Sequence, residues 1–138
     1  MRYDRQMILP EIGEEGQRKL KQAKVLIVGV GGLGSPIALY LAGAGVGCIG
    51  LVDDDVVSIS NLQRQVLYSE KELGKPKAIC AAERLSALNS ETTSQPYPTR
   101  LTEENAQEII SQYDIVVDGC DNFPTRYLIN DICAKTGK

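Results

Sequence analysis

The sequence predicts an α/β fold of the Rossmann-like class, in which helices cover both faces of a mostly parallel sheet. Short apolar runs typical of buried strands alternate with segments of helical character, and a glycine-rich turn joins the first strand to the next helix. The chain has 138 residues, 43% of them hydrophobic, and a net charge of −3. This composition predicts a single folded domain and excludes the basic surface typical of nucleic-acid binding.

The chain before the first strand, residues 1–23, is expected to form an N-terminal helical arm. Its second half, residues 14–23, is polar and compatible with a helix. Residues 24–30 form an apolar run, as expected of a parallel strand that is buried on both faces. The Rossmann-like nucleotide-binding domain is therefore expected to cover residues 24–138.

The glycine-rich turn leads into an expected helix over residues 33–44. Pro36 is tolerated there because the N–H that proline lacks has no intrahelical partner in a first turn. Gly45 and Gly47 are expected to end this helix, because glycine is favoured just beyond a helix C-terminus. The second strand then covers residues 48–53.

The second half of the sequence continues the alternation of helices and strands. Pro76 opens a segment whose apolar residues recur at helical spacing. Thr102, with Glu104 and Asn105 nearby, gives an approximate capping box for a later helix. The elements expected here are a helix over residues 76–88, a strand over 93–97, a helix over 102–112, a strand over 115–118 and a helix over 123–136.

No charged residue occurs between Val25 and Val52, a stretch long enough for a membrane-spanning helix. Glycines recur throughout this stretch, and Pro36 lies within it. A strand, a helix and a second strand account for the same residues without a bilayer. We therefore expect no membrane segment and no membrane partner.

The cysteines form no C-x-x-C pair, and the sequence has no histidine. A zinc site and any mechanism with an imidazole base are therefore not expected in this chain. No apolar segment of a secretory signal follows Arg2, so we expect a reducing, cytoplasmic location. We expect Cys48 and Cys120 to be packing residues of strands. Cys80 and Cys133 are expected to be packing residues of helices.

The glycine-rich turn matches the pattern G-x-G-x-x-G, formed between a strand and a helix by Gly29, Gly31, Gly32 and Gly34. In that context glycines allow a tight turn and a close approach of phosphate to the helix N-terminus. Asp53 follows about 20 residues later, where a carboxylate can accept hydrogen bonds from ribose. These features predict a nucleotide site without naming the nucleotide. An NAD-dependent oxidoreductase is one alternative, and glycines that serve only packing are another.

Arg64 and Lys77 place positive charge just after the predicted ribose-binding strand. Hydride transfer from NAD needs no such charges, whereas nucleotidyl transfer uses them to neutralise phosphates. The alternative interpretation is that both are solvated surface residues. The residues after Asp53, which are Asp54 and Asp55, are interpreted as solvated or loop-capping rather than catalytic.

Asp121 follows the last predicted strand, at the sheet edge where open α/β proteins bind their ligands. Its carboxylate is suited to Mg²⁺, which prefers oxygen ligands. A second interpretation, compatible with the first, is that Asp121 caps the helix beginning at residue 123.

Several short motifs remain once the fold is accounted for: Arg2-Tyr-Asp-Arg5-Gln6, the turn Gly29 to Gly34, Leu41-Ala-Gly-Ala-Gly-Val-Gly47, Asp53-x-Asp55, Asn61-Leu-Gln-Arg64-Gln65, Gly74-Lys-Pro-Lys77, and Asp121-Asn122 with Arg126. With these motifs the chain resembles the ThiF/MoeB/HesA family, the ubiquitin-activating-enzyme-like adenylyltransferases of sulfur-carrier proteins. The resemblance covers the whole chain in the family's order and spacing. It is closest to the thiazole-biosynthesis branch.

The resemblance implies that the chain uses ATP and Mg²⁺ to adenylate a ubiquitin-fold sulfur-carrier protein ending in Gly-Gly, as in thiamine or molybdopterin biosynthesis. It assigns catalysis to Arg5, Arg64, Lys77 and Asp121. Asp121 would hold Mg²⁺, and Arg5 would reach the ATP of the neighbouring subunit in a homodimer. The implied nucleotide-binding residues are Gly29, Gly31, Gly32, Gly34, Asp53, Asp55, Asn61, Arg64 and Lys77.

The resemblance also implies a chain that is truncated at its C-terminus. Lys138 follows directly on a predicted helix, where a doubly wound sheet normally continues into another strand. In the family, the part that follows docks the carrier tail and holds the zinc-binding cysteines. A nonenzymatic module that dimerises with a full-length relative is therefore a further alternative.

Overall fold

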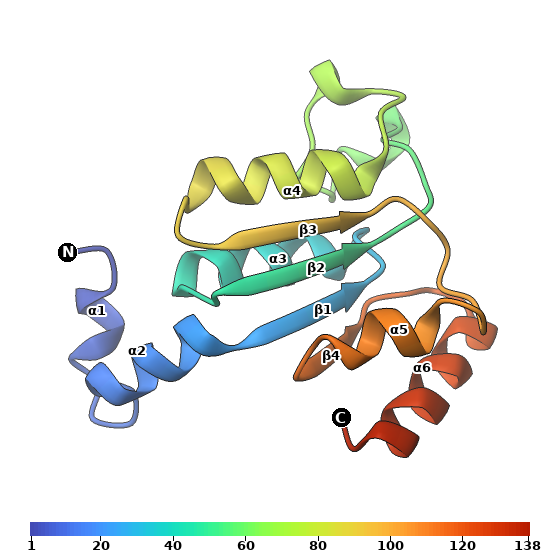
Figure 1. Cartoon of the computed structure of the whole chain (residues 1–138). Coiled ribbons are helices and arrows are strands. Elements are labelled where there is room, and N and C mark those ends of the chain that lie inside the picture. Colours follow the sequence, from blue (N-terminus) through green and yellow to red (C-terminus); the bar gives the residue numbers. More distant parts are fainter.

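The computed structural model describes residues 1–138 and contains a four-stranded parallel sheet with helices on both faces (Figure 1). The sheet has the order β3-β2-β1-β4. Its strands are β1 (Lys24–Val28), β2 (Cys48–Val52), β3 (Thr93–Tyr97) and β4 (Ile115–Asp118). The helices are α1 (Asp4–Met7), α2 (Gly13–Gln22), α3 (Gly34–Ala44), α4 (Lys77–Leu88), α5 (Ala106–Ser111) and α6 (Phe123–Thr136). The structure confirms the expected Rossmann-like class.

The central strand β1 supplies side chains to two hydrophobic cores, one on each face of the sheet. Val25 and Ile27 belong to the first core, while Leu26 and Val28 belong to the second. Helices α3 and α4 cover the first core, and α5 and α6 cover the second (Figure 1). Because both faces of β1 are buried, its sequence is a continuous apolar run rather than an alternating one.

The expected elements agree with the structure to within two residues, with one exception. The helix expected over residues 102–112 is wrong in its first turn, because α5 begins only at Ala106. The Asn105 side chain instead closes a turn before the helix: its Oδ1 accepts from the Thr102 N–H at 2.8 Å, and its Nδ2 donates to the Arg100 carbonyl at 3.0 Å. No helix combines the length and the apolar character needed to cross a bilayer.

The N-terminal segment is fastened to the amino edge of the sheet, at the left in Figure 1. The Tyr3 hydroxyl accepts a hydrogen bond from Asn89 Nδ2 at 2.8 Å and donates to Glu91 Oε2 at 2.7 Å. Gln6 Nε2 donates to the Ala44 carbonyl at the end of α3, at 2.7 Å. Helix α1 has four residues, too few to be stable alone, so these contacts hold it in place.

Three glycines let two loops touch at the opposite, carboxyl edge. Gly29 has a φ of +90°, and a Cβ on Gly29 would lie 2.7 Å from the Gly119 carbonyl oxygen. A Cβ on Gly34, the first residue of α3, would overlap the Gly29 carbonyl oxygen. The loop after β1 and the loop after β4 therefore pack backbone against backbone.

A pair of substitutions within α3 tests this close packing. Gly34→Ala is expected to lower the free energy of unfolding by roughly 2 kcal/mol or more, because the methyl group forces the turn apart. Gly43→Ala is the matched control, since nothing lies within 4 Å of its Cβ position. It is expected to be neutral or to stabilise by up to about 1 kcal/mol. Urea unfolding of both variants measures the difference; equal stabilities would contradict the packing.

Candidate functional site

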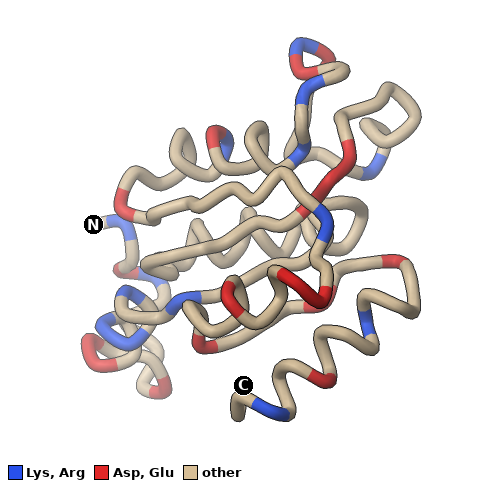
Figure 2. Tube along the Cα trace, turned by 45° about the vertical axis from the view of Figure 1, so that its right-hand side comes forward, with Lys and Arg blue, Asp and Glu red and all other residues tan.

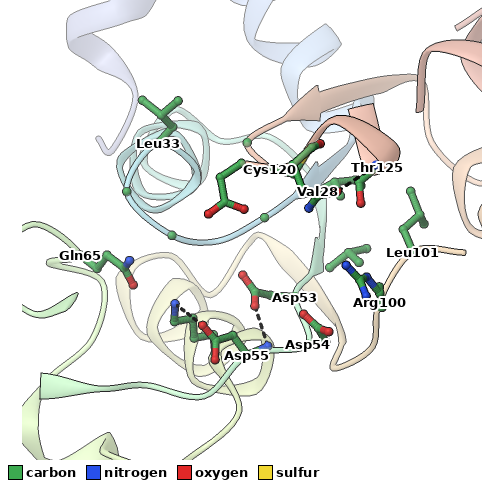
Figure 3. Close-up of a pocket in the computed structure, with 18 of the residues that line it drawn as sticks. Val28, Leu33, Asp53, Asp54, Asp55, Gln65, Arg100, Leu101, Cys120 and Thr125 are labelled. Atoms are coloured by element: carbon green, nitrogen blue, oxygen red, sulfur yellow. Dashed lines mark hydrogen bonds and ion pairs between the residues drawn. The ribbon is translucent and has the colours of Figure 1, made fainter. Parts of the chain in front are cut away.

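A cavity of about 740 Å³ opens at the carboxyl edge of the sheet, among the loops that follow all four strands. Neighbouring strands β1 and β4 lead to helices on opposite faces, which makes this the switch point where open α/β sheets bind ligands. The volume suits a nucleotide-sized molecule. Figure 3 shows the lining side chains of the β2 and β3 loops facing the glycine turn.

The four glycines of the G-x-G-x-x-G turn serve backbone packing, the cavity wall, or both. Gly29 and Gly34 make the backbone contacts described above, and Gly34 does not line the cavity. Gly31 and Gly32 do line it, facing the side chains of the segment before α4. Gly29 also lines the cavity, so it serves both packing and the cavity wall.

Asp53, directly after β2, is held by the backbone on both of its carboxylate oxygens. Oδ2 accepts from the Val30 N–H at 2.9 Å, and Oδ1 accepts from the Asp55 N–H at 2.8 Å. The first bond joins the end of β2 to the glycine turn; the second is drawn in Figure 3. A carboxylate oxygen has more than one lone pair, so both oxygens can still accept hydrogen bonds from a ligand.

Lys77 opens α4 and extends into the cavity as a nearly buried cation. Its side chain is 5% exposed and pairs with Asp55 at 3.3 Å, while the Asp55 side chain is 63% exposed. The Val56 N–H, bound to Asp55 Oδ1, and the Lys77 ammonium both lower the pKa of Asp55, against an opposing effect of burial. Asp55 therefore stays ionised at neutral pH and pairs with Lys77 at the cavity wall.

The loop before α4 contributes Asn61, Arg64 and Gln65. Asn61 ends a short 3₁₀ helix, Ile59–Asn61, and its Oδ1 accepts from the Ser58 hydroxyl at 2.8 Å. Arg64 is exposed. Gln65 is only 3% exposed, lines the cavity, and its Oε1 has no hydrogen-bond partner in the protein. An unpaired buried amide oxygen is costly, so a ligand that donates to it would be stabilised.

The start of α6 forms the other side of the cavity. The cap of this helix is Asn122, whose Oδ1 accepts from the Thr125 N–H at 3.0 Å, so the interpretation of Asp121 as the cap is wrong. Asn122 takes that position because it is the residue directly before the first turn. Asp121 lines the cavity with an exposed carboxylate. Arg126, one turn further on, donates from Nη2 to the Cys120 carbonyl at 3.0 Å.

Cys120 forms part of the cavity wall but is not an activated thiol. Burial and a hydrogen bond from its Sγ to Asp118 Oδ1 raise the pKa of Cys120 above its ordinary value. The protonated thiol is a poor nucleophile. Cys120 packs in the second core, and all four cysteines are unpaired.

Almost all of the sequence-predicted site residues meet in this cavity; the exceptions are Gly34 and Arg5. Arg5 lies on α1 at the opposite edge of the sheet (Figure 1).

Figure 2 shows the acidic segment after β2 beside basic positions of neighbouring loops. No cluster of three His, Cys, Asp or Glu residues suited to a metal is present. Sequence reasoning missed Thr99, Arg100, Leu101, Gly119 and Thr125 as lining residues.

These missed residues differ in the signal that they offer. Arg100 and its neighbours follow a weak strand, and only the path of the β3 loop across the sheet edge brings them to the cavity. Thr125 offers a signal, because it lies three residues after Asn122, about one helical turn further along α6. The cavity thus contains fixed charges of both signs but no histidine or activated thiol. Its cations suit it to bind an anionic group such as a phosphate.

Known proteins are similar to this chain over almost its entire length. The chain is 57% identical over 137 residues to the sulfur carrier protein adenylyltransferase of Thermus thermophilus, a match covering 99% of this chain and 51% of that protein. It is 54% identical over 138 residues to the adenylyltransferase and sulfurtransferase MOCS3 of Danio rerio, covering 100% of this chain and 30% of that one. The chain thus spans about half or less of the length of these curated relatives.

Solved structures share the fold and extend beyond it. The E. coli tRNA N6-threonylcarbamoyladenosine dehydratase TcdA, determined in complex with AMP, matches with a TM-score of 0.92 at 29% identity, covering 99% of this chain and 55% of that one. E. coli MccB matches with a TM-score of 0.82 at 34% identity, and the match covers 88% of this chain and 36% of MccB. The pattern of the ThiF family matches residues 3–138, almost the entire sequence, and the chain therefore belongs to the ThiF family.

Proposed function

We propose that this chain is the nucleotide-binding part of an ATP-dependent adenylyltransferase. Its substrate would be a ubiquitin-fold sulfur-carrier protein with a C-terminal Gly-Gly carboxylate, as in thiamine or molybdopterin biosynthesis. The Thermus thermophilus relative is named a sulfur carrier protein adenylyltransferase, the Danio rerio relative an adenylyltransferase and sulfurtransferase, and a relative in Porphyra purpurea a probable molybdopterin-synthase adenylyltransferase. The observation that carries the proposal is one cavity that joins Asp53 to Asn61, Arg64 and Lys77.

The proposed reaction needs charge neutralisation and no proton transfer. A carboxylate oxygen of the carrier attacks the α-phosphorus of ATP and forms the new O–P bond. The bond to the β-phosphate breaks, and its electron pair leaves with pyrophosphate. Arg64 and Lys77 stabilise the negative charge that builds on the phosphates, and Asp53 orients the ribose. The absence of histidine is therefore compatible with catalysis.

Asp121 is suited to the Mg²⁺ that accompanies ATP. Its carboxylate is exposed at the cavity wall, and Mg²⁺ in nucleotide sites takes one or two carboxylates together with phosphate oxygens. When bound, Mg²⁺ would neutralise phosphate charge beside Arg64 and Lys77.

Arg5 is proposed to act in a homodimer. It lies on α1, at the edge of the sheet remote from its own cavity, with an exposed side chain. Because α1 lies at the edge of the sheet opposite the cavity, we assign Arg5 to the nucleotide of a neighbouring subunit, as the resemblance implies. The four unpaired cysteines suit a reducing compartment, and we propose the cytoplasm as the location.

Two other functions make different predictions. An NAD-dependent oxidoreductase accounts for the glycine turn and Asp53, but leaves Arg64 and Lys77 without a role. A nonenzymatic module would dimerise and bind nucleotide without pyrophosphate exchange.

Lys77→Ala is expected to lower the rate of carrier-dependent ATP–pyrophosphate exchange by the full protein about 100-fold or more. The reason is the loss of a buried cation from the phosphate side of the cavity. Lys75→Ala, two residues earlier and exposed, is the matched control and should retain the rate. Arg64→Ala should behave like Lys77→Ala, and neither variant should unfold. Unchanged exchange in both would contradict the proposal.

Asp53→Asn is expected to weaken ATP binding while leaving the rate at saturating ATP nearly unchanged. A ribose contact is equally strong before and during the reaction, so its loss appears in affinity. Calorimetric titration with ATP gives the affinity, and the exchange assay gives the rate. Asp54→Asn is the control. Asp54 lines the same cavity, but it is Asp53 and not Asp54 that accepts the hydrogen bond from Val30 in the glycine turn. A lower saturated rate with intact affinity would refute the ribose assignment.

A further inference from the structure

The peptide between Val30 and Gly31, within the glycine turn, is held from its buried side by two hydroxyl groups. The Val30 carbonyl oxygen accepts a hydrogen bond from the Tyr68 hydroxyl at 2.6 Å and a second from the Ser35 hydroxyl at 3.1 Å. A carbonyl oxygen has two lone pairs, so the two bonds use its full capacity. Val30, Ser35 and Tyr68 are all buried. The oxygen therefore points into the protein.

The same geometry directs the Gly31 N–H away from the core. No cis peptide bond occurs in the chain, and the C=O and N–H of a planar trans peptide point in opposite directions. Because the Val30 oxygen faces the two hydroxyls, the N–H of the same peptide faces the other way, at a residue that lines the cavity. The Gly31 N–H donates no hydrogen bond within the protein. It is therefore a donor that is available to a ligand.

Glycine makes this peptide easy to turn over unless other groups hold it. Gly29 and Gly31 lie on either side of Val30, and glycine adopts positive and negative φ with similar ease. In the reversed orientation the Val30 carbonyl oxygen would face the cavity in place of the Gly31 N–H. A carbonyl oxygen repels a phosphate, whereas an N–H attracts it. The orientation of one peptide thus decides whether the turn favours an anion.

Asp53 holds the peptide on the other side of Val30, through the Val30 N–H. The two peptides that flank Val30 are therefore both fixed by side chains, which come from the end of β2, the start of α3 and the segment before α4. Burial and the nearby Asp53 carboxylate raise the pKa of Tyr68, so its hydroxyl remains a donor at neutral pH. The turn is thus organised before any ligand binds.

Tyr68 also fixes the place of the segment that contains Asn61, Arg64 and Gln65. The Tyr68 N–H donates to the Gln65 carbonyl at 3.2 Å, and the Gln65 N–H donates to the Asn61 carbonyl at 2.8 Å. The Tyr68 ring packs in the first core. Its hydroxyl therefore joins this segment of the cavity wall to the glycine turn.

We propose that Tyr68 and Ser35 are positioning residues for the nucleotide, which lock the Val30–Gly31 peptide so that the Gly31 N–H binds a phosphate oxygen. Two donors on the carbonyl also polarise the peptide and strengthen its N–H as a donor, because linked hydrogen bonds reinforce one another. Neither Tyr68 nor Ser35 lines the cavity. This inference rests on the proposed ATP-dependent function and identifies two side chains outside the cavity on which its phosphate site depends.

The test separates binding of the phosphates from binding of the rest of the nucleotide. Tyr68→Phe and Ser35→Ala should each weaken ATP binding by the full protein about threefold, and the double variant should weaken it about 30-fold. The double effect exceeds the product of the single effects, because one hydroxyl still holds the carbonyl in each single variant. Adenosine has no phosphate, so its affinity should not change. Calorimetric titration measures ATP binding, and competition against ATP measures adenosine binding.

Two matched controls remove a buried hydroxyl elsewhere. Tyr113→Phe removes a hydroxyl that pairs with the Tyr97 hydroxyl at 2.9 Å, and Thr92→Val removes one that donates to the Val46 carbonyl at 2.9 Å. Tyr113 and Thr92 are both buried, and neither lines the cavity. The control variants should lower Tm about as much as Tyr68→Phe and Ser35→Ala do, and should bind ATP with normal affinity.

The Gly31 amide reports the proposed contact directly in NMR spectra of protein labelled with ¹⁵N-glycine. Addition of ATP should move the Gly31 amide proton downfield in the unmodified protein, as expected when an N–H donates to a phosphate. The shift should be smaller in Tyr68→Phe and absent in the double variant. If the double variant does not fold, the comparison of Tyr68→Phe with Tyr113→Phe decides the question.

The outcomes separate this inference from the function on which it rests. ATP binding without a shift of the Gly31 amide, or normal ATP affinity in all three variants, would overturn the inference and leave the adenylyltransferase intact. Equal losses of ATP and adenosine affinity would also overturn it, because the hydroxyls would then only maintain the fold. A Gly31 shift with ATP but no carrier-dependent exchange by the unmodified protein would overturn the proposed function and leave the phosphate contact in place.

Discussion

The carboxyl edge of the sheet depends on one steric constraint, the direct backbone contact of two turns at glycine residues. Gly29 and Gly34 bring the start of α3 against the end of β1, and Gly119 brings the loop after β4 against the same turn. This contact fixes how far the glycine turn lies from the start of α6. The cavity opens beside it, so a side chain at any of the three positions would move the walls that hold the charged residues.

Backbone groups, more than ion pairs, position the charges of the cavity. Asp53 is held by two backbone N–H groups, and a backbone carbonyl fixes the guanidinium of Arg126. The one ion pair in the cavity joins Lys77 to a largely exposed Asp55. Because few charges neutralise one another, the cations can respond to an anionic ligand without first breaking a strong internal pair. This arrangement suits a site that must bind and release phosphates.

Patterns local in sequence predicted most of this architecture, and contacts between distant segments account for the rest. The apolar runs of the strands and the G-x-G-x-x-G spacing are local, so they placed the sheet, the turn and Asp53 correctly. Gly119 and Gln65 matter only because other segments fold against them. The Asn105 side chain forms a turn where a helical turn was expected. Its amide bonds two backbone groups, and helix propensity takes no account of such side-chain to backbone bonds.

The proposed function requires that the cavity bind the triphosphate of ATP in preference to a dinucleotide. Calorimetric titration of the full protein with ATP and Mg²⁺, and in parallel with NAD, tests it most directly, with light scattering to record the oligomeric state. We expect saturable ATP binding by a dimer and much weaker binding of NAD. Tighter binding of NAD than of ATP would contradict it, because Arg64 and Lys77 would then have no triphosphate to neutralise.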